Sequence, residues 1–210
     1  KELGVLSKKL ARIILDVPIE YKLNDFKLSD PDNKSVMKIF DELELNLDAI
    51  EKGGFAHFML KEIHEQPEAL RRCIAGRLDM SNGSAKLGGL RLDPVRLRTI
   101  PHVRLIGCGT ALNACKIGQL AIESLARIPA VAHVASEFRY NDPVINPNAL
   151  HFAVSQSGET ADTLSAVKEI QLKGGDVHGI VNVVGSTIAR KCGQGVYIHS
   201  GPEQAVASTK

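Results

Sequence analysis

The sequence has no tryptophan and few other aromatic residues, with three tyrosines and six phenylalanines among 210 residues. Proteins that bind single-stranded nucleic acid stack the bases on aromatic side chains, so this scarcity argues against such a surface. The formal net charge is only +2, and no basic run is interleaved with aromatic residues. We therefore expect no nucleic-acid partner.

Long apolar runs are also absent. No stretch approaches the roughly 18 apolar residues needed to cross a bilayer, and the start at Lys1-Glu2-Leu3-Gly4 has no apolar secretory segment. The four cysteines form no Cys-x-x-Cys pair and no metal-like spacing with the histidines. Free thiols in a reducing compartment are the simplest interpretation. We expect a cytoplasmic protein with no membrane partner, no metal and no cofactor.

The composition is that of an ordinary globular protein, with 44% hydrophobic and 24% charged residues. The length is sufficient for one sizeable core. The pattern changes near residue 95, from a polar, helical pattern to short apolar runs that alternate with helices. We divide the chain into an unassigned N-terminal segment (1–47), a helical lead-in (48–94) and an α/β domain (95–210).

Apolar periodicity in the first two segments predicts short helices at 7–15 and 36–50. A further helix is expected over 55–70, with a restart at Pro67, because proline is favoured in the first turn of a helix. The Gly/Ser-rich stretch 81–89 is typical of a loop.

Five short apolar runs after residue 95 predict buried strands. Strands that alternate with helices imply βαβ units and a parallel sheet. We therefore expect a flavodoxin-like three-layer α/β/α sandwich with a five-stranded parallel sheet, preceded by a mainly helical segment. The predicted strands are 103–106, 130–134, 150–154, 179–184 and 196–199, and the longer helices are 111–125 and 161–170.

The stretch Ser155-Gln156-Ser157-Gly158-Glu159-Thr160 is the most informative feature of the chain. It follows a predicted strand and precedes the helix 161–170, whose positions 161, 164, 167 and 170 share an apolar face. The first N–H groups of a helix have no partner inside it, and the helix dipole adds partial positive charge there. Hydroxyls at 155, 157 and 160 complete a cradle suited to phosphate. The alternative is that Ser157 and Thr160 are simple helix caps.

A second small-residue loop, Gly107-Cys108-Gly109-Thr110, follows another predicted strand. In parallel α/β sheets, ligands bind beyond the carboxyl ends of the strands, near a switch in strand order. Both loops lie at strand carboxyl ends. We therefore expect them to meet at one edge of the sheet, where a single ligand can touch both.

Several blocks of sequence resemble the first sugar-isomerase (SIS) domain of the glucosamine-6-phosphate synthase family, also called glutamine–fructose-6-phosphate aminotransferase. The blocks occur in the family's order, over roughly residues 48 to 210. A Ser-Gln-Ser-Gly-Glu-Thr stretch alone indicates only an SIS domain, and the upstream block makes the resemblance specific to the synthases. The blocks are Gly54–Pro67, Cys108–Thr110, Ala135–Tyr140, Ser155–Leu164 and Val206–Lys210.

The resemblance implies that the chain binds fructose 6-phosphate or glucosamine 6-phosphate, as a homodimer and without a cofactor. The family's reaction joins amide-nitrogen transfer from glutamine to ketose–aldose isomerisation, in amino-sugar (UDP-GlcNAc) biosynthesis. Ala111 stands where the family usually has serine, so a contact there must come from its backbone. The substrate contacts that the resemblance implies are Thr110, Ala111, Ser155, Gln156, Ser157, Thr160, Val206 and Ser208.

The resemblance assigns no catalytic residue to this chain. It places the glutaminase nucleophile, the isomerase's acid/base carboxylate, the ring-opening histidine and the Schiff-base lysine in other parts of the synthase. We therefore expect a sugar-phosphate-binding part that is inactive alone. Two alternatives stay open: a non-catalytic SIS-domain sugar-phosphate sensor, and a unit that serves only in dimerisation.

Two other groups of residues invite a chemical interpretation. Cys108, between two glycines, has the setting of a nucleophile, but His102 lies at the other end of the predicted strand. His57 and His64 are seven residues apart, with Lys61 four after the first, so no His-Glu-x-x-His pattern exists. We expect neither nucleophilic catalysis nor a metal site here.

Overall fold

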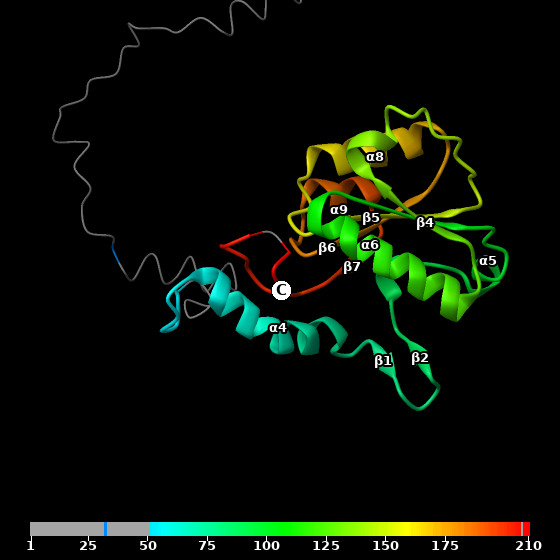
Figure 1. Ribbon diagram of the computed structural model, residues 1–210. Coiled ribbons are helices and arrows are strands. Elements are labelled where there is room, and N and C mark those ends of the chain that lie inside the picture. The colour runs from blue at the N-terminus through cyan, green and yellow to red at the C-terminus, as the bar shows by residue number, and fades with distance from the viewer. Residues whose placement is uncertain (1–31, 33–50, 207) are drawn as a thin grey trace, which may run out of the picture. The chain divides into compact units, whose positions relative to one another are not determined.

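The computed structural model describes residues 32, 51–206 and 208–210. Our predicted helices at 7–15 and 36–50 lie outside the described residues. The described residues 51–206 and 208–210 belong to one compact unit built on a five-stranded sheet (Figure 1). Among the helices that the structure describes, none has the length and apolar character to span a membrane.

Every strand pair in the five-stranded sheet is parallel, which confirms the predicted fold class. The strands follow the order β4-β3-β5-β6-β7. The chain therefore steps from β3 to one side and then returns to place β5 on the other, so strand order switches between β3 and β5. The strands are β3 (Val103–Gly107), β4 (Ala130–Val134), β5 (Leu150–Ser155), β6 (Val177–Val181) and β7 (Gly195–Tyr197).

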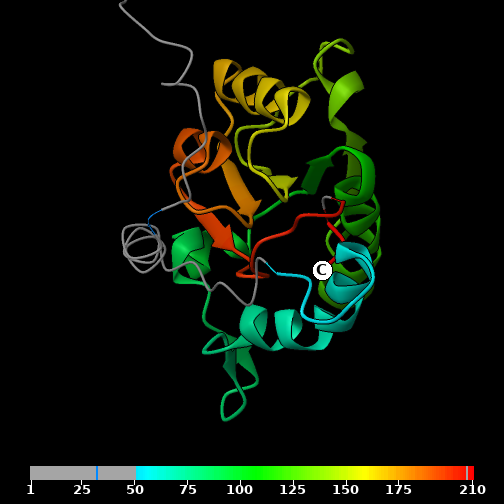
Figure 2. The same ribbon diagram turned by 90° about the vertical axis from the view of Figure 1, so that its left-hand side faces the viewer.

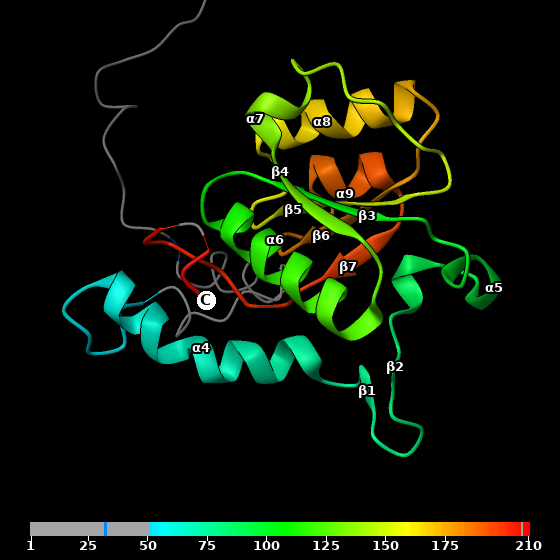
Figure 3. The ribbon, with the colours of Figure 1, turned by 45° about the vertical axis from the view of Figure 1, so that its right-hand side comes forward.

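Helices cover both faces of this sheet. Helix α6 (Gly109–Ala121) lies on one face, and α7 (Ala135–Phe138), α8 (Ala161–Leu172) and α9 (Thr187–Cys192) lie on the other (Figure 3). A separate buried apolar cluster fills each gap, with Ile106, Val167 and Ile188 in one and Val103, Leu105 and Cys115 in the other. The expected three-layer sandwich is therefore confirmed.

The predicted bounds of two strands are wrong. We expected a strand over 179–184, but β6 ends at Val181 because the next residue, Asn182, turns toward the C-terminal segment. The Asn182 amide donates to the carbonyl of Gly201, 2.8 Å away, and accepts from the N–H of Ser200 at the same distance. The last strand ends at Tyr197, before His199 takes a left-handed conformation with φ 53°.

Helix α4 (Phe58–Ile74) is continuous, so the predicted restart at Pro67 is wrong. A proline inside a helix leaves one carbonyl, here that of Ile63, without its usual donor and costs about 3 kcal/mol. Contacts with the C-terminal segment on both sides of Pro67 offset this cost. They are made by Glu62, before the proline, and by Arg72, after it.

The lead-in to the sheet also contains a short hairpin. Strands β1 (Leu78–Asp79) and β2 (Ser84–Ala85) pair antiparallel, so the predicted loop over 81–89 contains a strand and the start of the 3₁₀ turn η2 (Gly88–Leu90). Helix α5 (Pro94–Leu97) follows, and its cap Asp93 accepts the N–H of Val95 at 3.0 Å. Asp93 and the first-turn proline are ordinary helix-start signals.

The two longer helices differ in detail from the prediction. Helix α6 begins two residues before the predicted start at 111 and passes into a π-helical turn, η3 (Ile122–Ala126). In α8, positions 167 and 170 are buried as expected, whereas Ala161 is exposed. The face that α8 buries comprises Thr163, Ala166, Val167 and Ile170.

Candidate functional site

The loops after β3 and β5 meet in one pocket of about 200 Å³ at the carboxyl edge of the sheet. Because strand order switches between these two strands, the loops diverge there and leave room for a ligand. Seven of the eight predicted contact residues line this pocket, and only Val206 does not. The lining residues are Cys108, Gly109, Thr110, Ala111, Val154, Ser155, Gln156, Ser157, Thr160 and Ser208.

Hydrogen bonds inside the β5–α8 loop fix its shape. Ser155 is 3% exposed, and its hydroxyl oxygen lies 2.9 Å from that of Thr160. The Ser155 oxygen also accepts the N–H of Gly158 at 3.1 Å. The buried Ser155 therefore stabilises the loop through its hydrogen bonds. The half-buried Gln156, Ser157 and Thr160 form the surface that is accessible to a ligand.

The start of α8 is open toward this pocket. Thr160 is the residue before the helix, and its side chain makes no capping hydrogen bond. The hydroxyl of Ser157 accepts the N–H of Glu159 at 3.2 Å, which closes a short turn before the helix begins. The interpretation of Thr160 as a side-chain cap is therefore wrong, and the positive end of the helix dipole remains available to an anion.

Gly158 allows the loop to pack tightly against α9. Its φ is +65°, and an added Cβ would overlap the hydroxyl of Ser186 and lie 2.5 Å from the Ser186 Cβ. The Gly158 carbonyl accepts the N–H of Ile188 at 2.9 Å, and the Glu159 carboxylate accepts the N–H of Thr187 at 2.8 Å. These hydrogen bonds to Thr187 lower the pKa of Glu159. The start of α9 thus fixes the loop from behind.

The loop after β3 is equally restricted. An added Cβ on Gly107 would lie 3.2 Å from both the Cys115 sulfur and the Ala111 carbonyl carbon, and Gly109 has a φ of +55°. The backbone of Ala111 therefore packs closely against Gly107, and Ala111 lines the pocket. Cys108 lines the pocket, and His102 precedes β3, so the length of the strand separates the two.

The third wall comes from the C-terminal segment, which runs from the end of β7 to the side of α4 (Figure 2). Ser208 lines the pocket in a left-handed conformation, with φ 67°, and its N–H donates to the Glu203 carboxylate at 2.6 Å. Val206 is 54% exposed and does not line this pocket. Glu203 was not predicted from the sequence, because no local pattern links a glutamate to an N–H five residues later.

His64 and Cys115 lie outside this pocket and make packing contacts. The ring of His64 stacks on Phe55 with centroids 5.3 Å apart. Cys115, on α6, is 1% exposed, and burial raises the pKa of its thiol to about 11. Over residues 51–206 and 208–210, no group of three His, Cys, Asp or Glu side chains is arranged to hold a metal ion.

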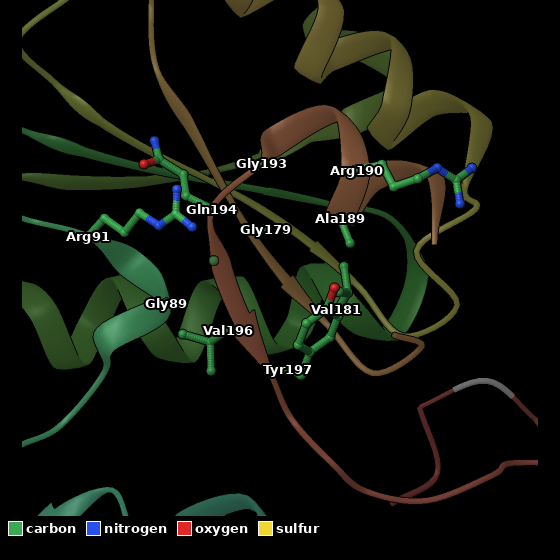
Figure 4. Close-up of a pocket in the computed structure, with 11 residues that line it drawn as sticks. Gly89, Arg91, Gly179, Val181, Ala189, Arg190, Gly193, Gln194, Val196 and Tyr197 are labelled. Carbon is green, nitrogen blue, oxygen red and sulfur yellow. The ribbon is translucent and has the colours of Figure 1, made fainter. Parts of the chain in front are cut away.

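A second pocket, of about 260 Å³, lies between β7, η2 and α9 (Figure 4). Its two arginines, Arg91 and Arg190, lie at opposite ends, with Val196 and Tyr197 between them. Arg190 is already engaged, because it donates to the hydroxyl of Thr187 at 3.1 Å. The polar side chains of this second pocket do not converge on one point, whereas the hydroxyls of Ser155 and Thr160 in the β3–β5 pocket lie together.

The fold and the β3–β5 pocket define a class: a three-layer α/β/α protein whose hydroxyl-rich loops line a pocket at the switch point of a parallel sheet. A model of the SIS domain family matches residues 96–210, and the chain belongs to this family.

Curated relatives cover most of the chain. The glutamine–fructose-6-phosphate aminotransferase (isomerizing) of Chlorobaculum tepidum is 48% identical over 179 residues, which are 85% of this chain. The protein of the same name from Symbiobacterium thermophilum is 50% identical over 160 residues, which are 76% of this chain. The chain spans 29% and 26% of the lengths of these two relatives.

A solved structure has the same arrangement. It is the C-terminal domain of glucosamine-fructose-6-phosphate aminotransferase from Francisella tularensis, with a TM-score of 0.67 and 34% identity. The alignment covers 76% of this chain and 44% of that one.

Proposed function

We propose that this chain is the sugar-phosphate-binding part of a glutamine–fructose-6-phosphate aminotransferase. The enzyme would make glucosamine 6-phosphate from fructose 6-phosphate and glutamine. The observation that carries this proposal is the pocket at the β3–β5 switch, where hydroxyls of the 155–160 loop surround the uncapped start of α8. The names of relatives at 48% and 50% identity support the choice of substrate.

The proposed roles follow from the geometry of the pocket. Ser157 and Thr160, with the first N–H groups of α8, hold the phosphate, because charge-assisted hydrogen bonds to an anion are the strongest available there. Gln156 and Thr110 orient the phosphate and the sugar. The backbone of Ala111 and the hydroxyl of Ser208 approach the sugar from the other two walls.

We assign no catalytic step to this chain. Nitrogen transfer and isomerisation belong to the proposed whole enzyme, and this chain supplies substrate binding. We further propose a homodimer in the cytoplasm. The cytoplasmic location is supported by the four cysteines, none of which is paired in a disulfide. The names of the relatives favour the aminotransferase over a non-catalytic SIS-domain sensor.

Calorimetric titration of the 210-residue chain with fructose 6-phosphate tests the proposal, with fructose as the matched control. We expect saturable binding that needs the phosphate, because fructose lacks the anion for which the pocket is suited. Equal binding of both sugars would contradict the proposed phosphate site. A chain that binds neither sugar, but sediments as a defined oligomer, would instead support the interpretation as a dimerisation unit.

A further inference from the structure

Helix α4 places a buried carboxylate under the C-terminal segment. Glu62 is 3% exposed, and its Oε1 accepts the N–H of Gln204 at 2.5 Å and that of Ala205 at 3.1 Å. These two N–H groups are far from α4 in sequence, and a single carboxylate oxygen holds both. Hydrogen bonds to a charged acceptor are about twice as strong as neutral ones, so this contact fixes the start of the segment firmly.

A second carboxylate fixes the end of the segment. Glu203 directs one oxygen to the N–H of Ser208, 2.6 Å away, and the other to the N–H of Lys210, 2.8 Å away. Because Glu203 immediately precedes Gln204, the carboxylate of Glu62 also fixes the backbone that carries Glu203. The two glutamates therefore act in series, from α4 to Ser208.

Further contacts hold the segment against α4. The Lys210 ammonium lies 2.5 Å from the Glu65 carboxylate and donates to the Pro202 carbonyl at 2.6 Å. The Arg72 guanidinium donates to the Ser200 carbonyl at 2.8 Å. The side of α4 that faces the segment thus buries charged residues, Lys61 and Glu62, beside apolar Ala69, and buried charges are unusual on a helix.

The arrangement has costs that core packing alone would not require. The second oxygen of Glu62 is buried and has no hydrogen-bond partner among the described residues, and a buried polar atom without a partner is destabilising. Ser208 adopts a left-handed conformation, with φ 67°, that residues with a side chain seldom take. Such features persist where surrounding contacts over-determine them, and they cluster at functional sites.

We propose that Glu62 is a positioning residue for the candidate site. Through the backbone of Gln204 and Ala205 and the carboxylate of Glu203, it holds Ser208 as the wall of the pocket that faces the sugar. The role toward a ligand rests on the proposed function. The contact itself does not, because it exists without any ligand.

Amide hydrogen exchange in the 210-residue chain tests the contact. In Glu62→Ala, exchange at Gln204 and Ala205 should rise roughly tenfold or more, because both N–H groups lose their acceptor. Glu62→Gln keeps an acceptor oxygen without its charge and should give a smaller rise. Glu68→Ala is the matched control, because Glu68 is an exposed glutamate of the same helix that pairs with Arg71. Unchanged exchange at Gln204 and Ala205 in Glu62→Ala, with protection of β5 intact, would overturn the proposal.

Affinity measurements with two ligands distinguish a positioning role of Glu62 from a general effect on the stability of the fold. Fructose 6-phosphate should bind Glu62→Ala roughly tenfold more weakly than it binds the unchanged chain, whereas inorganic phosphate should bind both within about twofold. Equal weakening of both ligands would mean that Glu62 only stabilises the fold and would overturn the positioning role. If Glu62→Ala does not fold, Glu62→Gln must weaken the binding of fructose 6-phosphate more than that of inorganic phosphate, though by less than is expected for Glu62→Ala. Otherwise the proposal is wrong. A chain that binds neither ligand would contradict the proposed function, and the exchange experiment would still decide whether Glu62 holds the segment.

Discussion

The hydroxyl oxygens of Ser155 and Thr160 lie 2.9 Å apart and join the end of β5 to the residue that precedes α8. Ser155 also accepts the N–H of Gly158, so the loop is closed by its own side chains. A loop that is ordered before its ligand arrives loses less conformational entropy on binding. This favours a preformed anion site over one that assembles around the ligand.

The double substitution Ser157→Ala with Thr160→Ala should weaken the binding of fructose 6-phosphate. Each hydroxyl offers a charge-assisted hydrogen bond worth roughly 1.5–3 kcal/mol. The loss of affinity, measured by calorimetric titration, should therefore exceed about a hundredfold. Because Thr160 also bonds to Ser155, the unfolding free energy of the variant must be measured beside its affinity.

Ser124→Ala is the control for that experiment. Ser124 bonds to the Ala121 carbonyl at 3.2 Å, at the far end of α6 from the pocket. We expect its affinity for fructose 6-phosphate to be unchanged. A double variant that bound the sugar phosphate as tightly as this control would refute the assignment of both hydroxyls.

Gly158→Ala should destabilise the fold by about 2–4 kcal/mol, because it adds a steric overlap to a left-handed backbone. The added Cβ would overlap Ser186, which is 3% exposed at the start of α9. Gly174 is the matched control, since its φ is +81° but nothing lies within 4 Å of an added Cβ. Urea unfolding should show a loss of only about 1 kcal/mol for Gly174→Ala. Equal losses would show that the overlap with Ser186 is unimportant.

Acid should destabilise the protein through His151. The ring is 0% exposed, its Nδ1 lies 3.1 Å from the Asp176 carbonyl, and its Nε2 has no partner among the described residues. Burial lowers the pKa of His151 from 6.5 to about 4, and nearby positive charge on Arg104 adds to the effect. The unfolded chain therefore binds a proton first as the pH falls, and stability is lost between about pH 6.5 and pH 4.

His151→Gln removes this titration. The stability difference between the unchanged chain and the variant should narrow by roughly 1–3 kcal/mol as the pH falls through that window. Urea midpoints at several pH values measure it. His57→Gln, at an exposed position before α4, should run parallel to the unchanged chain. Parallel curves for His151→Gln as well would contradict the role given to burial.

The four thiols should differ in their rates of alkylation. Burial raises the pKa of Cys115 to about 11 and that of Cys192 to about 12, so neither forms much thiolate at pH 8. Iodoacetamide should therefore label Cys73 and Cys108 before Cys115 and Cys192. Peptide mass spectrometry measures the order. Similar rates at all four sites in the folded chain would be inconsistent with the packing around Cys115 and Cys192.

Local patterns in the sequence predict the central sheet well. Short apolar runs place β3, β4 and β5 almost to the residue. They fail for β6, where buried His178 interrupts the apolar run and Asn182 ends the strand through contacts far away in sequence. Pro67 misleads for the same reason, because the C-terminal segment stabilises a helix that local propensity would break.

The site divides in the same way. The 155–160 loop is predictable because its hydroxyls, its glycine and the following helix are contiguous in the chain. The meeting with Thr110 follows from the rule that strands of a parallel sheet end at one edge. Glu62 was not found, because its partners Gln204 and Ala205 are brought to it only by the tertiary fold.

We propose that a sugar phosphate binds between the loops that follow β3 and β5. Backbone amide shifts of the labelled 210-residue chain, followed by NMR during titration with fructose 6-phosphate, test it most directly. We expect the largest saturable shifts at Thr110, Ser157, Thr160 and Ser208, and none at Gly195 in the second pocket. Shifts concentrated around Gly195, with the 155–160 loop unaffected, would contradict it.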